Sequence, residues 1–247
     1  MVRTQVFTHS LSLILRLVDT TTGRNIPGRE TVVRINADAV RFVEKEGGLL
    51  VFQNLGLRTF HLEVDAAYYE TVRRDVDLDA LDSKQPLVEL QLIPGKSLPG
   101  MAELQEVEGR LPGIRELTAV SAGDNSCLIQ EFDPRKKLMK LFNPHHLALE
   151  RIAYALVDPD TNQYEIFHIV KRIDNQTIKI DRSLEMSFRN SFPISPVVTG
   201  RCDPDGDYRL CLRREMGGAR WLIRWMAGEE VFFRLVDFRE TPHPQLE

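Results

Sequence analysis

Apolar side chains recur at every second position in short runs along most of the chain. The clearest run places Leu11, Leu13, Leu15 and Leu17 on one side of an extended segment. Successive side chains of a strand point to opposite sides, so this spacing is typical of a strand with one strongly apolar face. The sequence therefore predicts a mostly β protein with little helix.

Further segments have the same character. Strands are expected at residues 31–35, 49–52, 59–64, 70–76 and 87–93, and later at 165–173, 177–180, 208–213, 221–226 and 231–238. Turn-forming residues separate them, such as Asp174-Asn175-Gln176, which predicts a hairpin. Many short strands with turns between them favour a sandwich or a barrel. A short helix is expected only at residues 135–142, because Asp133-Pro134 supplies a cap and a first-turn proline.

Two Pro-Gly pairs, Pro94-Gly95 and Pro99-Gly100, interrupt the pattern, and a third follows at Pro112-Gly113. Proline and glycine together disfavour both helix and sheet. We therefore predict a β-sandwich over residues 1–93, a linker over 94–113 and a second β-rich domain, a barrel or a sandwich, over 114–247.

Charge and hydropathy restrict the partners. The chain has 32 basic and 36 acidic residues, a formal net charge of −4, so no broad nucleic-acid-binding surface is expected. No apolar run approaches the ~20 residues of a membrane span, so no membrane partner is expected either.

Residues 11–18 have no basic head and no cleavage site, which argues against a signal peptide. Cys127, Cys202 and Cys211 cannot all pair within one chain, so a cytoplasmic protein with reduced thiols is expected.

Part of the first domain carries motifs of a known family. They are Leu15-Arg16-Leu17-Val18-Asp19 with Thr22-Gly23, then Gly48-Leu49-Leu50-Val51-Phe52 with Leu55, then Phe60-His61-Leu62-Glu63-Val64 followed by Ala67-Tyr68-Tyr69. In these motifs residues 11–93 resemble the carboxypeptidase-regulatory-like, transthyretin-like β-sandwich family, although Ala67 stands where the family commonly has glycine. The resemblance implies a non-catalytic module and transfers no catalytic residue. Residues 98–247 resemble no family that we recognise.

Two acidic runs have some of the oxygen side chains that calcium prefers. Asp203-Pro204-Asp205-Gly206-Asp207 and Asp158-Pro159-Asp160-Thr161-Asn162 both depart from the spacing of an EF-hand loop. We interpret the first as an acidic turn and the second as a hairpin turn, and whether Asp203, Asp205 and Asp207 bind calcium stays open. The adjacent His145-His146 pair lacks metal-ligand spacing.

The motifs of familiar enzymes are missing from the sequence. It has no nucleophile elbow around Ser121, no phosphate-binding glycine loop and no dinucleotide fingerprint. Cys127 is interpreted as a small core residue. We therefore assign no catalytic residue, no cofactor and no metal ligand.

One stretch concentrates the residue types that are enriched at protein interfaces. Five arginines and two tryptophans occur between residues 209 and 225, against the single acid Glu215. The candidate interface residues are Arg209, Arg213, Arg214, Arg220, Trp221, Arg224 and Trp225. Two other readings remain: solvated arginines beside core tryptophans, or a site for an anionic ligand such as single-stranded nucleic acid.

The leading functional hypothesis is a non-catalytic, structural interaction protein that binds other protein subunits in an oligomer or hetero-assembly. A phage-tail-like or contractile injection particle is the most concrete example. One alternative is carbohydrate or small-ligand binding, with Tyr68, Tyr69 or Trp221 as stacking platforms. Another is a hydrolase with a site in residues 114–240 that uses Asp203 and Asp205 or the His145-His146 pair.

Overall fold

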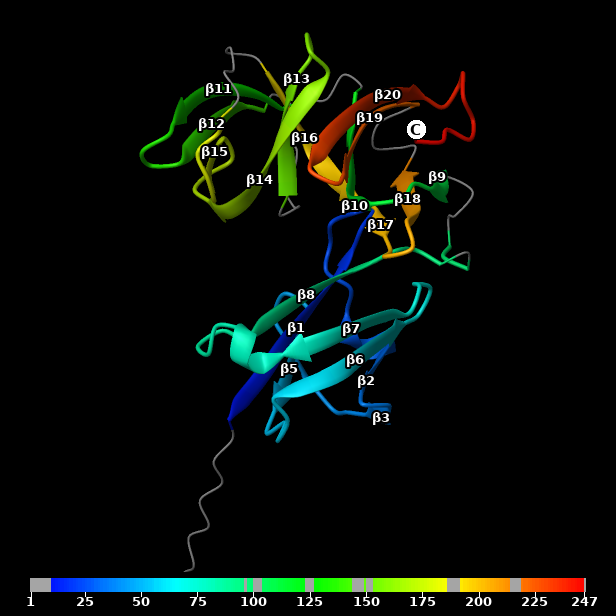
Figure 1. Ribbon diagram of the computed structural model, residues 1–247. Helices are drawn as coiled ribbons and strands as arrows, with labels where there is room; N and C mark the ends of the chain where they lie inside the picture. The colour runs from blue at the N-terminus through cyan, green and yellow to red at the C-terminus, as the bar shows by residue number, and fades with distance from the viewer. Residues whose placement is uncertain are drawn as a thin grey trace, which may run out of the picture. The chain divides into compact units, whose positions relative to one another are not determined.

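The computed structural model describes residues 10–95, 97–99, 104–122, 127–143, 149, 153–185, 192–213 and 219–246 (Figure 1). Strands dominate these ranges, which hold two short 3-10 turns, η1 (Gly28–Glu30) and η2 (Leu78–Ala80), and no α-helix. The predicted mostly β fold with little helix is confirmed. Within the described ranges no helix is long and apolar enough to cross a membrane.

The chain forms two compact units. Unit 1 contains Met1–Asp19 and Asn25–Pro99, and unit 2 contains Thr20–Arg24 and Gly100–Glu247. Each unit has its own apolar core.

Unit 1 consists of two four-stranded sheets around one core. The first sheet has the order β4-β5-β1-β8, and the second has the order β3-β2-β6-β7. Their bounds are β1 (Leu11–Asp19), β2 (Thr31–Ile35), β3 (Asp38–Ala39), β4 (Val43–Lys45), β5 (Leu49–Gln53), β6 (Thr59–Ala66), β7 (Val72–Asp77) and β8 (Leu87–Leu92). All pairs are antiparallel except β1 with β8.

The core of unit 1 follows directly from the alternation in the sequence. Leu13, Leu15 and Leu17 of β1 are fully buried, and Leu62 and Val64 of β6 meet them from the second sheet. Both sheets therefore contribute one apolar face to a shared interior, which is the arrangement of a sandwich.

Six strands of unit 2 form a closed, antiparallel barrel. Their order around the ring is β11-β12-β15-β14-β13-β16, and β16 pairs with β11 to complete it. Their bounds are β11 (Cys127–Asp133), β12 (Leu138–Phe142), β13 (Ala153–Asp158), β14 (Gln163–Arg172), β15 (Thr177–Ile180) and β16 (Pro193–Thr199). Apolar side chains such as Met139, Leu156 and Phe167 fill the interior.

The sheet continues beyond the barrel through β16. The strands β10 (Ile114–Ser121), β19 (Arg220–Ala227) and β20 (Glu230–Asp237) extend it in that order. A separate three-stranded sheet consists of β17 (Arg201–Cys202), β18 (Asp207–Arg213) and β9 (Leu104–Arg110). Side chains of the two sheets, including Val107, Leu210, Ile223 and Trp225, share a second core.

Two expectations are corrected at this level. The segment 94–113 is not simply a linker, because β9 pairs with β18 along its length and buries Val107 completely. The helix expected at 135–142 is instead a turn followed by β12. The Asp133 carboxylate accepts the main-chain N–H of Arg135, Lys137 takes a left-handed φ of 55°, and β12 then faces the barrel interior.

Candidate interaction surface

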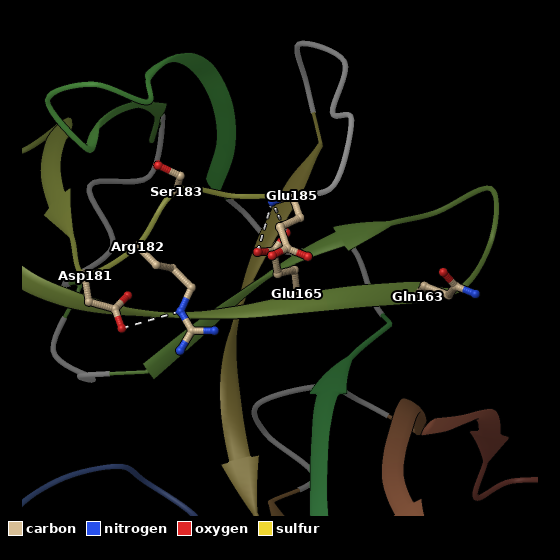
Figure 2. Close-up of a pocket in the computed structure, with 6 residues that line it drawn as sticks. All are labelled: Gln163, Glu165, Asp181, Arg182, Ser183 and Glu185. Atoms are coloured by element: carbon tan, nitrogen blue, oxygen red, sulfur yellow. Dashed lines mark hydrogen bonds and ion pairs between the residues drawn. The ribbon is translucent and has the colours of Figure 1, made fainter. Parts of the chain in front are cut away.

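An open pocket of about 800 Å³ lies beside β14 and the segment that follows β15 (Figure 2). Two of its side chains come from β14, where they flank the buried Tyr164. The lining residues are Gln163, Glu165, Asp181, Arg182, Ser183 and Glu185.

Asp181 connects this segment to β14. The main-chain N–H of His168 donates to one carboxylate oxygen of Asp181 (2.9 Å), and His168 Nδ1 lies 3.1 Å from the other. Partial burial alone would raise the pKa of Asp181, but its hydrogen bonds and electrostatic interaction with His168, with Arg182 nearby, hold it below its usual value. Asp181 is therefore ionised at neutral pH and acts as a structural tie.

The other polar groups of the pocket are also engaged by the chain. The main-chain N–H of Glu185 donates to both carboxylate oxygens of Glu165, at 2.9 and 3.1 Å, as Figure 2 shows. The Ser183 hydroxyl donates to the carbonyl oxygen of Pro134 (3.3 Å). These bonds fix the path of residues 181–185 across the barrel and bring no nucleophile to a base.

Three lysines on neighbouring barrel strands form a row close to that segment. Lys171 of β14 lies directly opposite Lys179 of β15, and Lys140 of β12 lies opposite Thr177, diagonal to Lys179. All three are exposed, and none forms an ion pair within the described ranges; even Glu131, opposite Lys140 in the register, is not bonded to it. Lys171 and Lys179 thus face each other directly, and like charges in this arrangement are destabilising.

Exposed apolar side chains lie at the same end of these strands. Val170 is the extra residue of a bulge, since Ile169 pairs with Ile180 and Lys171 with Lys179, and its side chain is 61% exposed. Ile173, 52% exposed, enters the hairpin turn.

Phe142, 46% exposed, ends β12 beside that turn, because the preceding residue donates its N–H to the carbonyl of Gln176. Cationic and apolar groups are thus combined around the β14–β15 hairpin and the end of β12. We call this set the lysine-hairpin surface; it comprises Lys140, Phe142, Val170, Lys171, Ile173 and Lys179.

The two tryptophans of the predicted interface lie in a core. Trp221 and Trp225 are buried between the sheet of β10 and β19 and the sheet of β18 and β9. Their side chains alternate with Leu222 and Arg224 along β19, so the same period-two pattern that marks the strand also directs both indoles inward. They offer no surface to a partner of the folded chain.

Most of the predicted interface arginines bind groups within the chain. Arg209 forms an ion pair with Glu106 of the adjacent strand at 2.6 Å, and Arg224 forms one with Glu116 at 2.9 Å. The Nε of Arg213 donates to the Thr21 hydroxyl, which also belongs to unit 2 (3.0 Å).

The two remaining arginines differ from these. Arg220 is exposed, and Arg214 lies outside the described residues. Arg209 and Arg224 therefore connect neighbouring strands of the chain, unlike the three lysines of the barrel.

Both acidic runs form turns. Asp203 accepts the main-chain N–H of Asp207 through its carboxylate (3.1 Å) and that of Gly206 through its carbonyl (3.0 Å), which closes the turn between β17 and β18. The Asp158 carboxylate accepts the N–H of Asp160 (2.9 Å) at the β13–β14 hairpin, as predicted. Across the described ranges, no three His, Cys, Asp or Glu side chains gather as a metal site.

The other reactive candidates are dispersed. The His145-His146 pair lies outside the described residues. The three cysteines form no disulfide, and burial raises the pKa of Cys127 and, with Asp203 nearby, raises that of Cys202 to about 11. Asp203 and Asp205 do not line the pocket beside β14.

No protein-family model matches the chain, and no curated protein sequence matches it. The geometry of the chain's own residues is therefore the basis for a functional assignment. Sequence reasoning missed the lysine-hairpin surface because Lys140 is far from Lys171 and Lys179 in the chain. The predicted hairpin turn at 174–176 could have suggested part of this surface, because it has Lys171 before it and Lys179 after it.

Proposed function

We propose that this chain is a non-catalytic interaction protein, a subunit of a larger protein assembly, and that it docks an acidic protein partner on the lysine-hairpin surface. The observation that carries the proposal is the row of Lys140, Lys179 and Lys171, unpaired within the described ranges, beside exposed Val170 and Ile173. A carboxylate from a partner would relieve the repulsion between Lys171 and Lys179.

The mixture of groups favours a protein over a nucleic acid. Protein interfaces combine an apolar centre with a polar rim, which matches three apolar side chains beside three lysines. Binding to a phosphate backbone relies on many Lys and Arg contacts, and this chain carries a net charge of −4. The partner that fits is a folded protein whose surface presents carboxylates around an apolar patch.

The rest of the proposal concerns context. We propose that unit 1 is a scaffold module of the carboxypeptidase-regulatory-like, transthyretin-like kind, and that a phage-tail-like or contractile injection particle is the concrete assembly. A cytoplasmic location belongs to the same proposal and is supported by three cysteines that form no disulfide.

The test compares two triple variants of the full chain. Lys140→Glu/Lys171→Glu/Lys179→Glu reverses the lysine row, and Arg41→Glu/Lys45→Glu/Lys84→Glu makes the same charge change at exposed positions of unit 1. Each tagged chain is expressed in the cells that make the protein, and its sedimentation in native extract is measured with and without nuclease.

We expect the unaltered chain and the control variant to sediment as an assembly with the partner, and the lysine variant to lose the partner and sediment as a much smaller species. A carboxyl-to-amine cross-linker should join Lys140, Lys171 or Lys179 to acidic residues of the partner. An unaltered chain that sediments alone, or a lysine variant that stays assembled, would refute the proposal. Dissolution of the assembly by nuclease would assign the surface to nucleic acid instead.

A further inference from the structure

β20 is the open edge of the nine-stranded sheet (Figure 1). It pairs with β19 along its whole length, and no other described strand pairs with it. Main-chain groups of an antiparallel strand alternate in direction, so about half of the N–H and C=O groups of β20 point away from β19. An eight-residue edge of this kind is a template for one more strand.

The middle of β20 is apolar and exposed. Val231, Phe232 and Leu235 are between 36% and 43% exposed. Phe232 stacks on Trp225, with ring centroids 5.5 Å apart and planes inclined by 15°, so its ring is held in one position. The edge is preorganised, and a partner strand would meet it at a small entropic cost.

Another edge strand of the same chain is protected in the usual way. β7 of unit 1 carries Arg73, Arg74 and Asp75 in its middle, and these charges discourage pairing with a further strand. β20 has charges only at Glu230, Arg234 and Asp237. Glu230 and Arg234 have opposite charges and lie four residues apart, so they can pair with each other across two antiparallel copies of β20.

We propose that β20 pairs antiparallel with β20 of a second copy of this chain, with Phe232 opposite Phe232 of the copy. In this register Glu230 faces Arg234 of the second copy, and the twofold axis repeats that pair. Val231 faces Phe233 of the copy. Arg234 is exposed, and its Nη1 donates to the carbonyl of Gln245 (2.6 Å), which leaves its other nitrogen atoms for the carboxylate.

Other twofold registers are less favourable. Full overlap of the two eight-residue strands would need Glu230 opposite Asp237, but these side chains point to opposite faces of β20, so a twofold antiparallel pairing excludes this register. A register centred on Arg234 puts two guanidinium groups face to face and so sets like charges in contact. A register centred on Phe233 places Glu230 opposite Val236 and Arg234 opposite Phe232. Charge complementarity thus selects the register centred on Phe232.

The test uses charge reversal on the full chain, with mass measured by light scattering and sedimentation. Glu230→Arg alone and Arg234→Glu alone each convert two attractive pairs into two repulsive ones, and we expect the dissociation constant of the dimer to rise about tenfold. An equimolar mixture of the two variants has complementary pairs and should form heterodimers as tight as the unaltered dimer. The double variant Glu230→Arg/Arg234→Glu should dimerise for the same reason.

Matched controls are Glu44→Arg and Lys45→Glu on β4, an edge strand of unit 1, which should leave the dimer unchanged. A monomeric unaltered chain, or single variants that dimerise normally, would refute the inference. A mixture of the single variants that stays monomeric would do the same.

Cross-linking tests the register separately. In a Cys202→Ser background, Phe232→Cys should form an intermolecular disulfide on mild oxidation, whereas Leu235→Cys should not. The reverse pattern would overturn the register. If Phe232→Cys does not fold after losing its stack on Trp225, the charge-reversal mixture decides alone.

This inference concerns a different surface from the lysine-hairpin surface. A chain that dimerises through β20 but joins no larger assembly would refute only the proposed function, and the opposite result would refute only this inference.

Discussion

The hydroxyl groups of Thr118 on β10 and Tyr164 on β14 lie 2.7 Å apart, and both side chains are buried. β13 and β16 separate β14 from β10 in the sheet, so this hydrogen bond connects a barrel strand with the first strand of the extension. Burial raises the pKa of Tyr164 far above its usual value, and the phenol stays protonated.

The first prediction concerns this pair. Tyr164→Phe removes the phenol that bonds to the Thr118 hydroxyl, and Thr118→Val leaves Tyr164 with only the backbone of Arg224 as a partner. Each single change should cost about 1–3 kcal/mol of unfolding free energy, because the remaining buried polar group loses a hydrogen-bond partner. The double variant should cost less than the sum of the two. Urea titration of all four proteins measures the cycle, and strictly additive costs would contradict the hydrogen bond.

A second prediction concerns Gly109 of β9. A Cβ atom at this position would lie 2.5 Å from the hydroxyl oxygen of Tyr208, which accepts the N–H of Leu246 at 2.8 Å. Gly109→Ala should displace the ring, release the C-terminal segment and cost about 1–3 kcal/mol. Gly56→Ala is the matched control, since no atom lies within 4 Å of its added Cβ. Equal thermal midpoints for the two variants would contradict the packing.

Acid titration gives a third prediction. Hydrogen bonds from Arg239 lower the pKa of Asp237 to about 2, from a usual value of 3.8. A carboxyl with a lowered folded pKa stabilises the fold above its unfolded pKa, and this contribution is lost as the pH falls from about 4 toward 2. Arg239→Gln should raise the pKa of Asp237 and flatten the loss of stability in that window. Carboxyl NMR titration measures the pKa, and an unchanged value would contradict the assignment.

The fourth prediction separates core from surface at the tryptophans. Trp221→Ala should cost about 3–5 kcal/mol, as expected for a large aromatic residue in a core. Trp221→Phe should cost less, since the indole N–H has no hydrogen-bond partner in the described part of the chain. Denaturant unfolding measures both. A loss of unfolding free energy below about 0.5 kcal/mol for Trp221→Ala would contradict the core position of this residue.

The strands β1 and β6 were predicted because each has one buried and one more exposed face. β1 and β6 alternate cleanly, and their buried residues are the ones expected. β13 was missed because Tyr154 and Leu156 fill the barrel while Ala155 and Val157 pack on the extended sheet, so both faces are apolar and no alternation is left. β16 was missed for a related reason, since Pro193 and Pro196 are unusual within a strand.

The interaction surfaces could be predicted only in part. The strand that became β20 was expected at 231–238, but its place at the edge depends on the order of nine strands, which periodicity does not contain. The alignment of Lys140 with Lys179 depends on barrel register in the same way. Enrichment in arginine and tryptophan predicted an interface at residues 209–225. In the fold both tryptophans are core residues, and Arg209 and Arg224 form ion pairs within the chain.

β16 belongs to two structures at once. Its first residues pair with β11 and β13 in the barrel, and Val197–Thr199 pair with β10 in the extension. If β16 separates from either the barrel or the extension, the pairing that holds these two parts together is broken. Unit 2 should therefore melt in one cooperative transition, and a fragment cut between barrel and extension should not fold independently.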